Sequence, residues 1–317
     1  MLCRLVAKTY LLLVVFSVKC FAMARLLLFL ALIPILLLLG STPGSLHPVA
    51  DSLAVFRFHI AWFALAGAVV LLVQGWRRSG LAVGALSLAA IGAIWWSYFP
   101  QTPNDDLPYS LYQKNLSFRL GEADDIIAHI KGSDADFVTL QEVTRRNTEI
   151  LSGLSSTYAT QSLCKFRSVG GVAVASKYPR TDADILCIEE LGLVGMNVQT
   201  PDGPVWLLSL HLSWPYPYSQ AAHLDAILPT LENLKGPVVL GGDFNMVPWS
   251  YTMTRVEKAI RAKRVGATNG TFLLENLITI PIDHVLAPTN CVGEVSTLDL
   301  LGSDHHGVLA RFTLEAC

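Results

Sequence analysis

Residues 237–250 read Pro-Val-Val-Leu-Gly-Gly-Asp-Phe-Asn-Met-Val-Pro-Trp-Ser. The run 238–240 is short, apolar and rich in β-branched residues, which is typical of a strand buried on both faces. We expect the glycine pair 241–242 to end this strand, because glycine adopts backbone angles closed to other residues and lets a ligand come close. Asp243 and Asn245 follow at a spacing of two, which directs both side chains to the same side of an extended chain. Such a pair is suited to hold a water molecule or a phosphate oxygen, and an ordinary strand with a polar turn is the alternative.

The 317-residue chain consists of two different kinds of polypeptide. Residues 1–99 contain seven basic side chains and a single acidic one, Asp51, which gives a net charge of +6. Residues 100–317 contain 16 basic and 24 acidic side chains, a net charge of −8. This contrast predicts an apolar, basic N-terminal region joined to a separate acidic domain.

Three apolar stretches in the N-terminal region are candidates for transmembrane helices. A bilayer requires about 20 apolar residues per helix. The stretches cover residues 26–40, 53–75 and 79–99, and the last ends in an aromatic cluster of the kind found at membrane interfaces. We therefore expect a membrane anchor over residues 23–99, preceded at 1–22 by a leader or an N-terminal extension.

Positive charges predict the orientation of this anchor, since basic residues favour the cytoplasmic side of a membrane. They precede the first stretch and lie between the second and the third, at Arg77 and Arg78. The segment 41–52 and everything after residue 99 should then face the periplasm or an extracellular space. The chain is thus predicted to be a multi-pass membrane protein, with a proline-rich linker at 100–110.

The cysteines of the acidic region agree with an outward location. Cys164, Cys187, Cys291 and Cys317 are an even number in what would be an oxidising compartment. Four cysteines allow three pairings, and we favour Cys164–Cys187 with Cys291–Cys317 because the members of each pair are close in sequence. The sequence contains no Cys-x-x-Cys pair, so we expect no structural zinc.

Polar side chains end apolar strand patterns at two further points. Glu142 lies at the end of the run 136–143, and His211 lies at the polar end of the pattern 206–215. A carboxylate at a buried strand end needs a cationic side chain or a metal as its partner, because an isolated buried charge is too costly. An exposed strand end is the alternative for Glu142, and a lone histidine such as His211 is more often structural.

Three more signals lie near the two ends of the acidic region. Asp283 lies within an apolar strand pattern, and Asp304 with His305 precedes the final strand. An aspartate that accepts the imidazole N–H of a histidine fixes its tautomer and stabilises its charged form. Asn115 is expected near the end of the first strand, which we place at 111–117.

The order of these patterns predicts an α/β domain. Strand patterns outnumber helical patterns, and helices follow several of the strands, which indicates mixed sheets covered by helices. The expected helices cover residues 121–131, 144–154, 218–234 and 251–264.

Taken together, these residues resemble the endonuclease/exonuclease/phosphatase superfamily. The ordered set is Leu-Gln-Glu142, Leu-His211-Leu, Gly-Gly-Asp243-Phe-Asn245, Ile-Asp283-His and Ser-Asp304-His305, together with Asn115. The resemblance covers residues 111–317 and implies a four-layer sandwich of two packed mixed β-sheets flanked by helices, preceded by the three transmembrane helices. The membrane-anchored form is similar to a bacterial subgroup of this family, which implies a location in the bacterial inner membrane.

The resemblance also implies a role for each residue. The metal would be Mg²⁺, with Mn²⁺ as an alternative, and its site would contain Glu142 as principal ligand, with Asn115 and Asp304 close to it. Among the residues implied in catalysis, Asp243 would orient or deprotonate the attacking water, and Asn245 would hold a phosphate oxygen. His305 would contact the phosphoryl group, and Asp283 would orient His305. His211 would be a second phosphate contact or an acid.

The function implied by the resemblance is that of a membrane-anchored, outward-facing, Mg²⁺-dependent phosphoester hydrolase of phosphodiesterase or nuclease type. The substrate would be nucleic acid or a lipid headgroup, and no obligate protein partner is expected. The net charge of −8 in residues 100–317 disfavours nucleic acid, whose binding draws most of its affinity from basic side chains. The alternatives are a lipid-phosphoester phosphatase, a catalytically silent domain that binds phosphorylated ligands, and a sensor domain on transporting spans.

Overall fold

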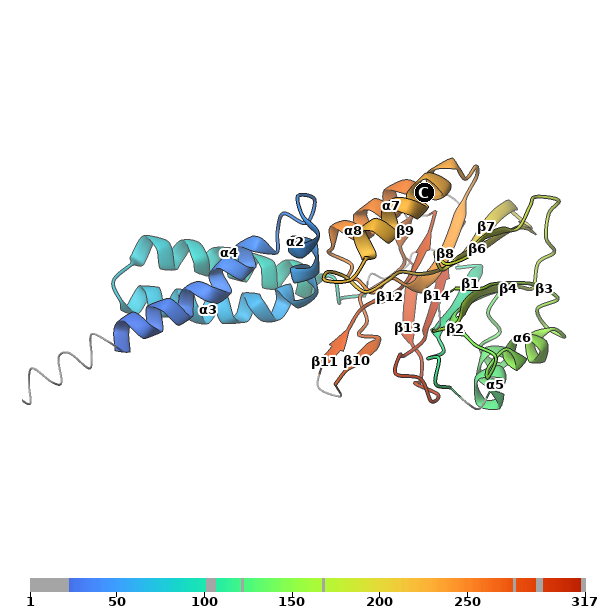
Figure 1. The fold of residues 1–317 in the computed structure, drawn as a ribbon, viewed down its shortest axis with the longest axis horizontal. Coiled ribbons are helices and arrows are strands. Elements are labelled where there is room, and N and C mark those ends of the chain that lie inside the picture. Colours follow the sequence, from blue (N-terminus) through green and yellow to red (C-terminus); the bar gives the residue numbers. More distant parts are fainter. Residues whose placement is uncertain are drawn as a thin grey trace, which may run out of the picture. The chain divides into compact units, whose positions relative to one another are not determined.

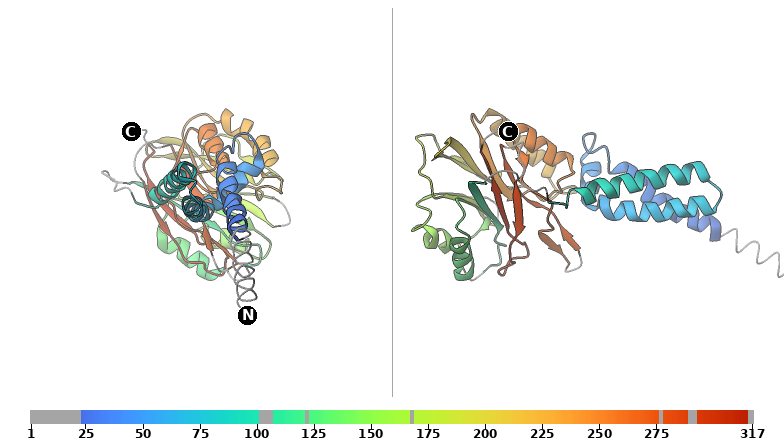
Figure 2. Two further views of the ribbon diagram at one scale, coloured as in Figure 1. Left: turned by 90° about the vertical axis from the view of Figure 1, so that its left-hand side faces the viewer. Right: turned by 180° about the vertical axis from the view of Figure 1, so that it is seen from behind.

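A computed structural model provides the structure of the chain and describes residues 23–100, 107–120, 123–166, 169–275, 278–288 and 293–314. The chain divides into two compact units (Figure 1, Figure 2). The first consists of Met1–Pro43 and Phe56–Trp96, and the second of Gly44–Val55 and Ser97–Cys317. Residues 1–22, where we expected a leader or an extension, lie outside the described residues.

The first unit is built from apolar helices. Three helices of the described chain are long and apolar enough to cross a membrane, namely Met23–Gly40, Pro48–Val73 and Arg77–Trp96. The second comprises α2 (Pro48–Leu53), the short helix η1 (Ala54–Phe56) and α3 (Arg57–Val73), and its first part, residues 48–55, belongs to the second unit. The third is α4. Large apolar side chains of the first unit are exposed, such as Phe63 at 68% and Trp96 at 72%. The three expected apolar helices are therefore confirmed.

The second unit contains two six-stranded mixed sheets, each with one parallel strand pair at its centre. A separate hairpin pairs β10 (Phe272–Leu274) with β11 (Ile278–Ile280). The first sheet has the order β13 (Glu294–Thr297), β14 (Val308–Phe312), β1 (Tyr109–Asn115), β2 (Phe137–Val143), β4 (Gly171–Ser176), β3 (Thr160–Cys164). The second sheet has the order β5 (Leu186–Ile188), β6 (Leu193–Thr200), β7 (Gly203–His211), β8 (Val238–Asp243), β12 (Asp283–Ala287), β9 (Lys263–Arg264).

Buried apolar side chains arrange these sheets and their helices in four layers. One core lies between the sheets and includes Leu111, Phe137 and Val239. A second core packs α7 (Gln220–Asn233) and α8 (Tyr251–Ile260) on the sheet of β8, and a third packs α5 (Asp124–Ser133) and α6 (Glu149–Leu154) on the sheet of β2 (Figure 1). The predicted four-layer sandwich of two mixed sheets flanked by helices is confirmed.

The glycine pair after residue 240 does not end its strand, contrary to our expectation. Strand β8 continues through both glycines to Asp243. A Cβ atom on Gly241 would lie 2.3 Å from Thr139 Oγ1 of the facing sheet, and one on Gly242 would lie 2.2 Å from the carbonyl oxygen of Leu210. These glycines therefore permit close packing against neighbouring strands. The strand ends at Asp243, where strands of the facing sheet also end.

Helix α8 is shorter than its sequence pattern predicted. The pattern favoured residues 251–264, but α8 ends at Ile260 because Arg261 adopts a left-handed backbone with φ of 54°. The residues after it pair with β12 as strand β9. Pairing with the sheet therefore overrides the local helical preference in this segment.

A disulfide joins Cys164 of β3 to Cys187 of β5 and so links the two sheets at their outer strands. The predicted Cys164–Cys187 pair is confirmed. The predicted Cys291–Cys317 pair lies outside the described residues.

Replacing both Cys164 and Cys187 by alanine should lower the free energy of unfolding by about 2–4 kcal/mol, because the bridge restricts the unfolded chain. Urea unfolding of the full chain in detergent, compared with unreduced wild type, measures the difference. Peptide mapping without reductant provides the control, since it should recover the linked peptide. An unchanged unfolding midpoint, or free thiols at both positions, would contradict this role of the bridge.

Candidate active site

The predicted polar residues meet where strands of both sheets end. Asn115 ends β1, and Glu142 lies near the end of the parallel strand β2, directly after Gln141, the register partner of Asn115. In the other sheet, His211 ends β7 and Asp243 ends β8, and the two are register partners. Asp283 begins β12 and is the antiparallel partner of Asp243. The ends of the two parallel pairs, β1 with β2 and β7 with β8, thus lie together with the beginning of β12.

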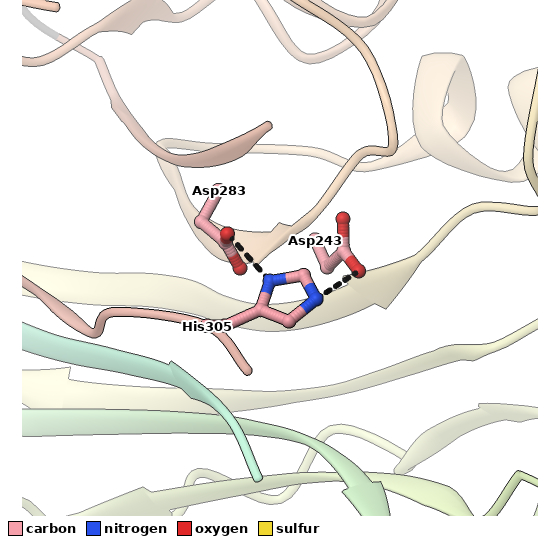
Figure 3. Close-up of side chains that lie close together, drawn as sticks. All are labelled: Asp243, Asp283 and His305. Carbon is pink, nitrogen blue, oxygen red and sulfur yellow. Dashed lines mark hydrogen bonds and ion pairs between the residues drawn. The ribbon is translucent and has the colours of Figure 1, made fainter. Parts of the chain in front are cut away.

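His305 lies between the two aspartates (Figure 3). Its Nδ1 is 2.8 Å from Asp283 Oδ2, and its Nε2 is 3.9 Å from Asp243 Oδ2. All three side chains are buried, and their ligand atoms lie within 4.8 Å of one another. Asp283 therefore accepts a hydrogen bond from the imidazole and directs its other nitrogen to Asp243.

Glu142 and Asp243 flank the amide nitrogen of Asn115. Asn115 Nδ2 is 3.0 Å from Asp243 Oδ2 and 3.4 Å from Glu142 Oε1. The oxygen of this amide is turned away, since it accepts the backbone N–H of Ser117. A bulge after Gln141 gives Glu142 a φ of 57° and turns its side chain into the site. Asn115 thus presents a donor that holds the two carboxylates, whereas a metal ligand would present its oxygen.

His211 lies against the same two carboxylates. Its Nε2 is 3.5 Å from Asp243 Oδ2 and 3.9 Å from Glu142 Oε1. The ring of Phe166 contacts the imidazole edge to face at 5.4 Å. His211 can therefore exchange a proton with a group bound between Glu142 and Asp243.

Asn245 lies just beyond β8 with a φ of 50°. Its backbone N–H donates to Asp243 Oδ1 at 2.8 Å, and its Nδ2 donates to the carbonyl of Leu212 at 2.8 Å. Its Oδ1 is buried and has no hydrogen-bond partner among the described residues. The side chain thus offers an acceptor toward a water molecule or a cation.

Asp304 differs from the other predicted residues because it is exposed and stands outside the buried group of Asp243, Asp283 and His305. Its carboxylate acts on the site through its charge, which raises the pKa of His305 along with other groups. The structure therefore brings seven of the eight predicted side chains together and leaves Asp304 at the rim.

The sequence of residues 113–305 matches the family model described as the Endonuclease/Exonuclease/phosphatase family. The chain belongs to this family. Its members are metal-dependent hydrolases of phosphoester bonds, and the chain is an enzyme of this class. No curated protein matches the chain in sequence.

The chain is also similar in fold to solved structures of low sequence identity. A humanized TDP2 of D. rerio is 14% identical, covers 65% of this chain and 98% of its own, and has a TM-score of 0.53. A truncated TDP2 of Caenorhabditis elegans is 17% identical over 66% of this chain and 100% of its own, with a TM-score of 0.50. An endonuclease/exonuclease/phosphatase family protein from Leptotrichia buccalis is 14% identical over 65% and 99%, with a TM-score of 0.49.

Burial and neighbouring charges set the protonation of this family member's site. Burial lowers the pKa of His305, but the carboxylates of Asp283 and Asp243 outweigh it and raise the pKa to about 9. Burial and the charge of Asp283 raise the pKa of Asp243 to about 8. Burial would also raise the pKa of Asp283, but its contact with His305 holds the pKa below its ordinary value. The site therefore favours an imidazolium paired with an ionised Asp283.

The atoms around Glu142 fit a divalent cation. Glu142 and Asp243 direct carboxylates at one amide nitrogen, and the buried Oδ1 of Asn245 adds an oxygen acceptor nearby in the chain. Burial raises the pKa of Glu142, as it does that of Asp243, so the two charges are only partly compensated by the protein. A divalent cation would provide the missing positive charge, and hard cations prefer such oxygen atoms.

Lys114 is a further residue of the site, which the sequence analysis did not single out. It is fully buried, and its Nζ donates to three backbone carbonyls, those of Asp299, Leu300 and His305. Burial lowers its pKa to about 8 even though nearby aspartates raise it. A lysine inside an expected strand, directly before Asn115, was the signal that could have identified it. Lys114 fixes the backbone from which His305 projects.

The sheets are joined behind the site by a chain of buried polar side chains. Gln113 Nε2 donates to Asp283 Oδ1 at 3.0 Å and to Gln141 Oε1 at 2.8 Å. Gln141 Nε2 in turn donates to Ser209 Oγ of the other sheet at 3.0 Å. This network binds Asp283 at Oδ1, while His305 binds the other carboxylate oxygen, Oδ2.

In the absence of metal, the free energy of unfolding should fall as the pH rises from about 6.5 to about 8, below the range in which the lowered pKa of Lys114 acts in the opposite direction. The folded-state pKa of His305 is raised, so the stability from its protonation is complete below its unfolded pKa and is lost as the pH passes the folded pKa. Asp243, whose pKa is also raised, acts in the same direction. Urea unfolding in a chelator across this pH range measures the slope.

The matched variant for this experiment is Asp283→Asn, because the carboxylate of Asp283 raises the pKa of both other groups. The asparagine keeps an oxygen for Gln113 and a similar shape. Its stability should depend less on pH than that of the wild type. Equal slopes in the two proteins would show that Asp283 does not set these pKa values.

Proposed function

We propose that the chain is a membrane-anchored, Mg²⁺-dependent hydrolase of phosphodiesters in which water attacks phosphorus. The observation that supports this most strongly is the buried group of Asp243, Asp283 and His305 beside Glu142. The two carboxylates and the imidazolium of this group lie within contact distance of one another, as proton transfer in general acid–base chemistry requires. A domain that only binds phosphate would need neither the Asp283–His305 pair nor a second carboxylate facing it.

Each side chain has a role in this proposal. Asp243 orients the attacking water and accepts its proton, and a pKa raised to about 8 suits a base that works near neutral pH. His305, kept charged by Asp283, donates to a phosphoryl oxygen, and His211 contacts a second oxygen or the leaving group. Glu142 would be the principal Mg²⁺ ligand, with Asn115 holding the carboxylates and Asp304 adding charge at the rim. When bound, the cation neutralises charge that develops on the phosphoryl oxygens.

The location follows from the N-terminal helices and the disulfide. Three helices long and apolar enough to cross a bilayer make the chain a multi-pass membrane protein in this proposal. Basic residues before the first helix and between the last two favour a cytoplasmic location for those segments. The Cys164–Cys187 bridge favours an oxidising compartment for the second unit. The catalytic unit would then face the periplasm or an extracellular space, as in a bacterial inner membrane.

The substrate class is a phosphodiester, either nucleic acid or a lipid headgroup. The net charge of −8 over residues 100–317 provides little attraction for nucleic acid. Beside the catalytic group, Phe272 contacts His305 at 4.7 Å and Trp214 at 5.5 Å between ring centroids. Trp214 is 43% exposed, so an apolar or aromatic part of a substrate can stack there. These features favour a lipid phosphoester over a duplex.

The test of the proposed function is metal-dependent hydrolysis by the purified full chain in detergent. The substrates are bis(4-nitrophenyl) phosphate, single- and double-stranded DNA, RNA, sphingomyelin and phosphatidylinositol phosphates. We expect hydrolysis that requires Mg²⁺ or Mn²⁺ and stops in a chelator. Glu142→Gln, Asp243→Asn and His305→Gln should each lower turnover by about 10²-fold or more.

The matched control is Asp182→Asn, which removes an exposed carboxylate away from the site and should leave turnover unchanged. Circular dichroism checks that each variant is folded. Full activity of Glu142→Gln, or hydrolysis that persists in a chelator, would contradict the proposal. A folded, metal-loaded chain that hydrolyses none of these substrates would favour the phosphate-binding alternative.

A further inference from the structure

The segment Gly44–Val55 belongs to the catalytic unit although it contains the beginning of the second apolar helix, Pro48–Val73. It falls inside the range 23–99 that we assigned to the anchor, and nothing in its sequence pattern predicted contacts with the sheets. It contains Asp51, the single acidic residue of the first 99. The carboxylate of Asp51 is buried, so its contacts decide what this segment does.

Asp51 binds the first turn of α8. Its Oδ1 accepts the backbone N–H of Tyr251 at 2.6 Å, and its Oδ2 accepts both the N–H and the hydroxyl of Thr252, at 2.9 and 2.8 Å. Ser250, the N-cap, accepts the next N–H, that of Met253. The amides of a first helical turn lack partners within the helix, and a carboxylate there also meets the positive end of the helix dipole. Asp51 therefore fixes where α8 begins.

The first turn of α8 is the far end of a short loop whose near end is catalytic. Residues 244–250 connect Asp243 to the N-cap Ser250. A second contact lies next to the N-cap, since Trp249 Nε1 donates to the carbonyl of Ala54 at 2.8 Å. Ala54 is fully buried and packs with Val247 of the same loop. The Gly44–Val55 segment thus holds the loop both at its end and along its length.

Gln220 connects the same point directly to the backbone beside Asp243. Thr252 Oγ1 lies 3.5 Å from Gln220 Oε1, and Gln220 Nε2 donates to the carbonyls of Ser213 and Phe244 at 2.8 and 3.1 Å. Asn245, next in the chain, directs its amide at the carbonyl of Leu212. Through Gln220, a shift of Thr252 therefore reaches the carbonyl of Phe244, which lies inside the Asp243–Asn245 motif.

The packing around Asp51 leaves little room for adjustment. A Cβ atom at Gly44 would lie 2.8 Å from Asp51 Oδ1 and 3.1 Å from Tyr251 Cβ. The glycine at position 44, the first residue of the segment, therefore permits its close approach to α8.

We propose that Asp51 is a positioning residue for catalysis, which holds Asp243 and Asn245 in place through the first turn of α8 and the loop 244–250. The proposal rests on the proposed hydrolase function for its kinetic consequence only. It makes the beginning of the second apolar helix, with the residues just before it, a part of the active site's support. Small displacements of catalytic groups by distant changes cost up to about 10²-fold in rate.

The test uses the full chain in detergent with Asp51→Asn and Thr252→Val. Asp51→Asn places an amide donor opposite backbone N–H groups, and Thr252→Val removes only the hydroxyl contacts to Asp51 and Gln220. The matched control is Leu46→Ala, in the same segment and 81% exposed. The first readout is amide hydrogen exchange at Phe244 and Asn245, and the second is hydrolysis of bis(4-nitrophenyl) phosphate with Mg²⁺.

We expect exchange at Phe244 and Asn245 to rise about tenfold or more in Asp51→Asn, with β1 and β2 unchanged. The kcat should fall about 10- to 100-fold while KM stays within about threefold, because positioning affects turnover more than binding. Thr252→Val should show a smaller change of both kinds, and Leu46→Ala none.

Faster exchange confined to Tyr251 and Thr252 would overturn the proposal, since Asp51 would then only cap the helix. So would faster exchange at Phe244 and Asn245 with an unchanged kcat. If the wild type hydrolyses nothing, the proposed function fails, and the exchange data still decide whether Asp51 holds the Asp243–Asn245 motif.

Discussion

The carboxylates of Asp243 and Asp283 are buried on adjacent strands, and the imidazole of His305 lies between them. Two buried carboxylates at this distance repel each other and resist ionisation unless a positive charge compensates them. The protein provides that charge as an imidazolium and holds it from several sides. Lys114 binds the carbonyl of His305, and Gln113 binds the oxygen of Asp283 that the imidazole leaves open. The remaining architecture of the site serves this arrangement.

The two sheets contribute to the site because each has a parallel strand pair that ends at the same edge. β1 with β2 delivers Asn115 and Glu142, and β7 with β8 delivers His211 and Asp243. Gly241 lets the sheets approach closely beneath the site. The functional groups are therefore attached to the most rigid part of the unit, where their mutual distances are set by strand register and not by loops.

The sequence predicted residues of the site well where an apolar run ends in a polar side chain. Asp243, Glu142 and His211 have this pattern, and strand burial explains why their polar ends stand out. Lys114 was missed because a lysine in a strand usually points to solvent, and the carbonyl of Asp299 that it binds is 185 residues away in the chain.

Other features depend on tertiary contacts that no local pattern records. The end of α8 is decided by pairing of the following residues with β12, and the continuation of β8 through two glycines is decided by the neighbouring chains. The contacts of Asp51 are likewise long-range, since 200 residues separate it from Tyr251. Asp304 was assigned to the metal site from the family resemblance, and its exposed position beside the buried His305 depends on the tertiary structure.

The chain passes between its two units three times, at residues 43–44, 55–56 and 96–97, so neither unit is a continuous piece of the gene. A crossover that replaced the N-terminal helices by another anchor would also remove Asp51 and Ala54 from the support of the loop 244–250. Enzymes commonly acquire a new anchor when a whole domain is replaced. In this chain such a replacement would damage the site unless the twelve residues Gly44–Val55 were kept in place. The order of synthesis also matters, because Gly44–Val55 leaves the ribosome before the loop 244–250 and helix α8, which it contacts. The residues after 97 are synthesised last, and they must fold around a segment whose two ends are already connected to the first unit.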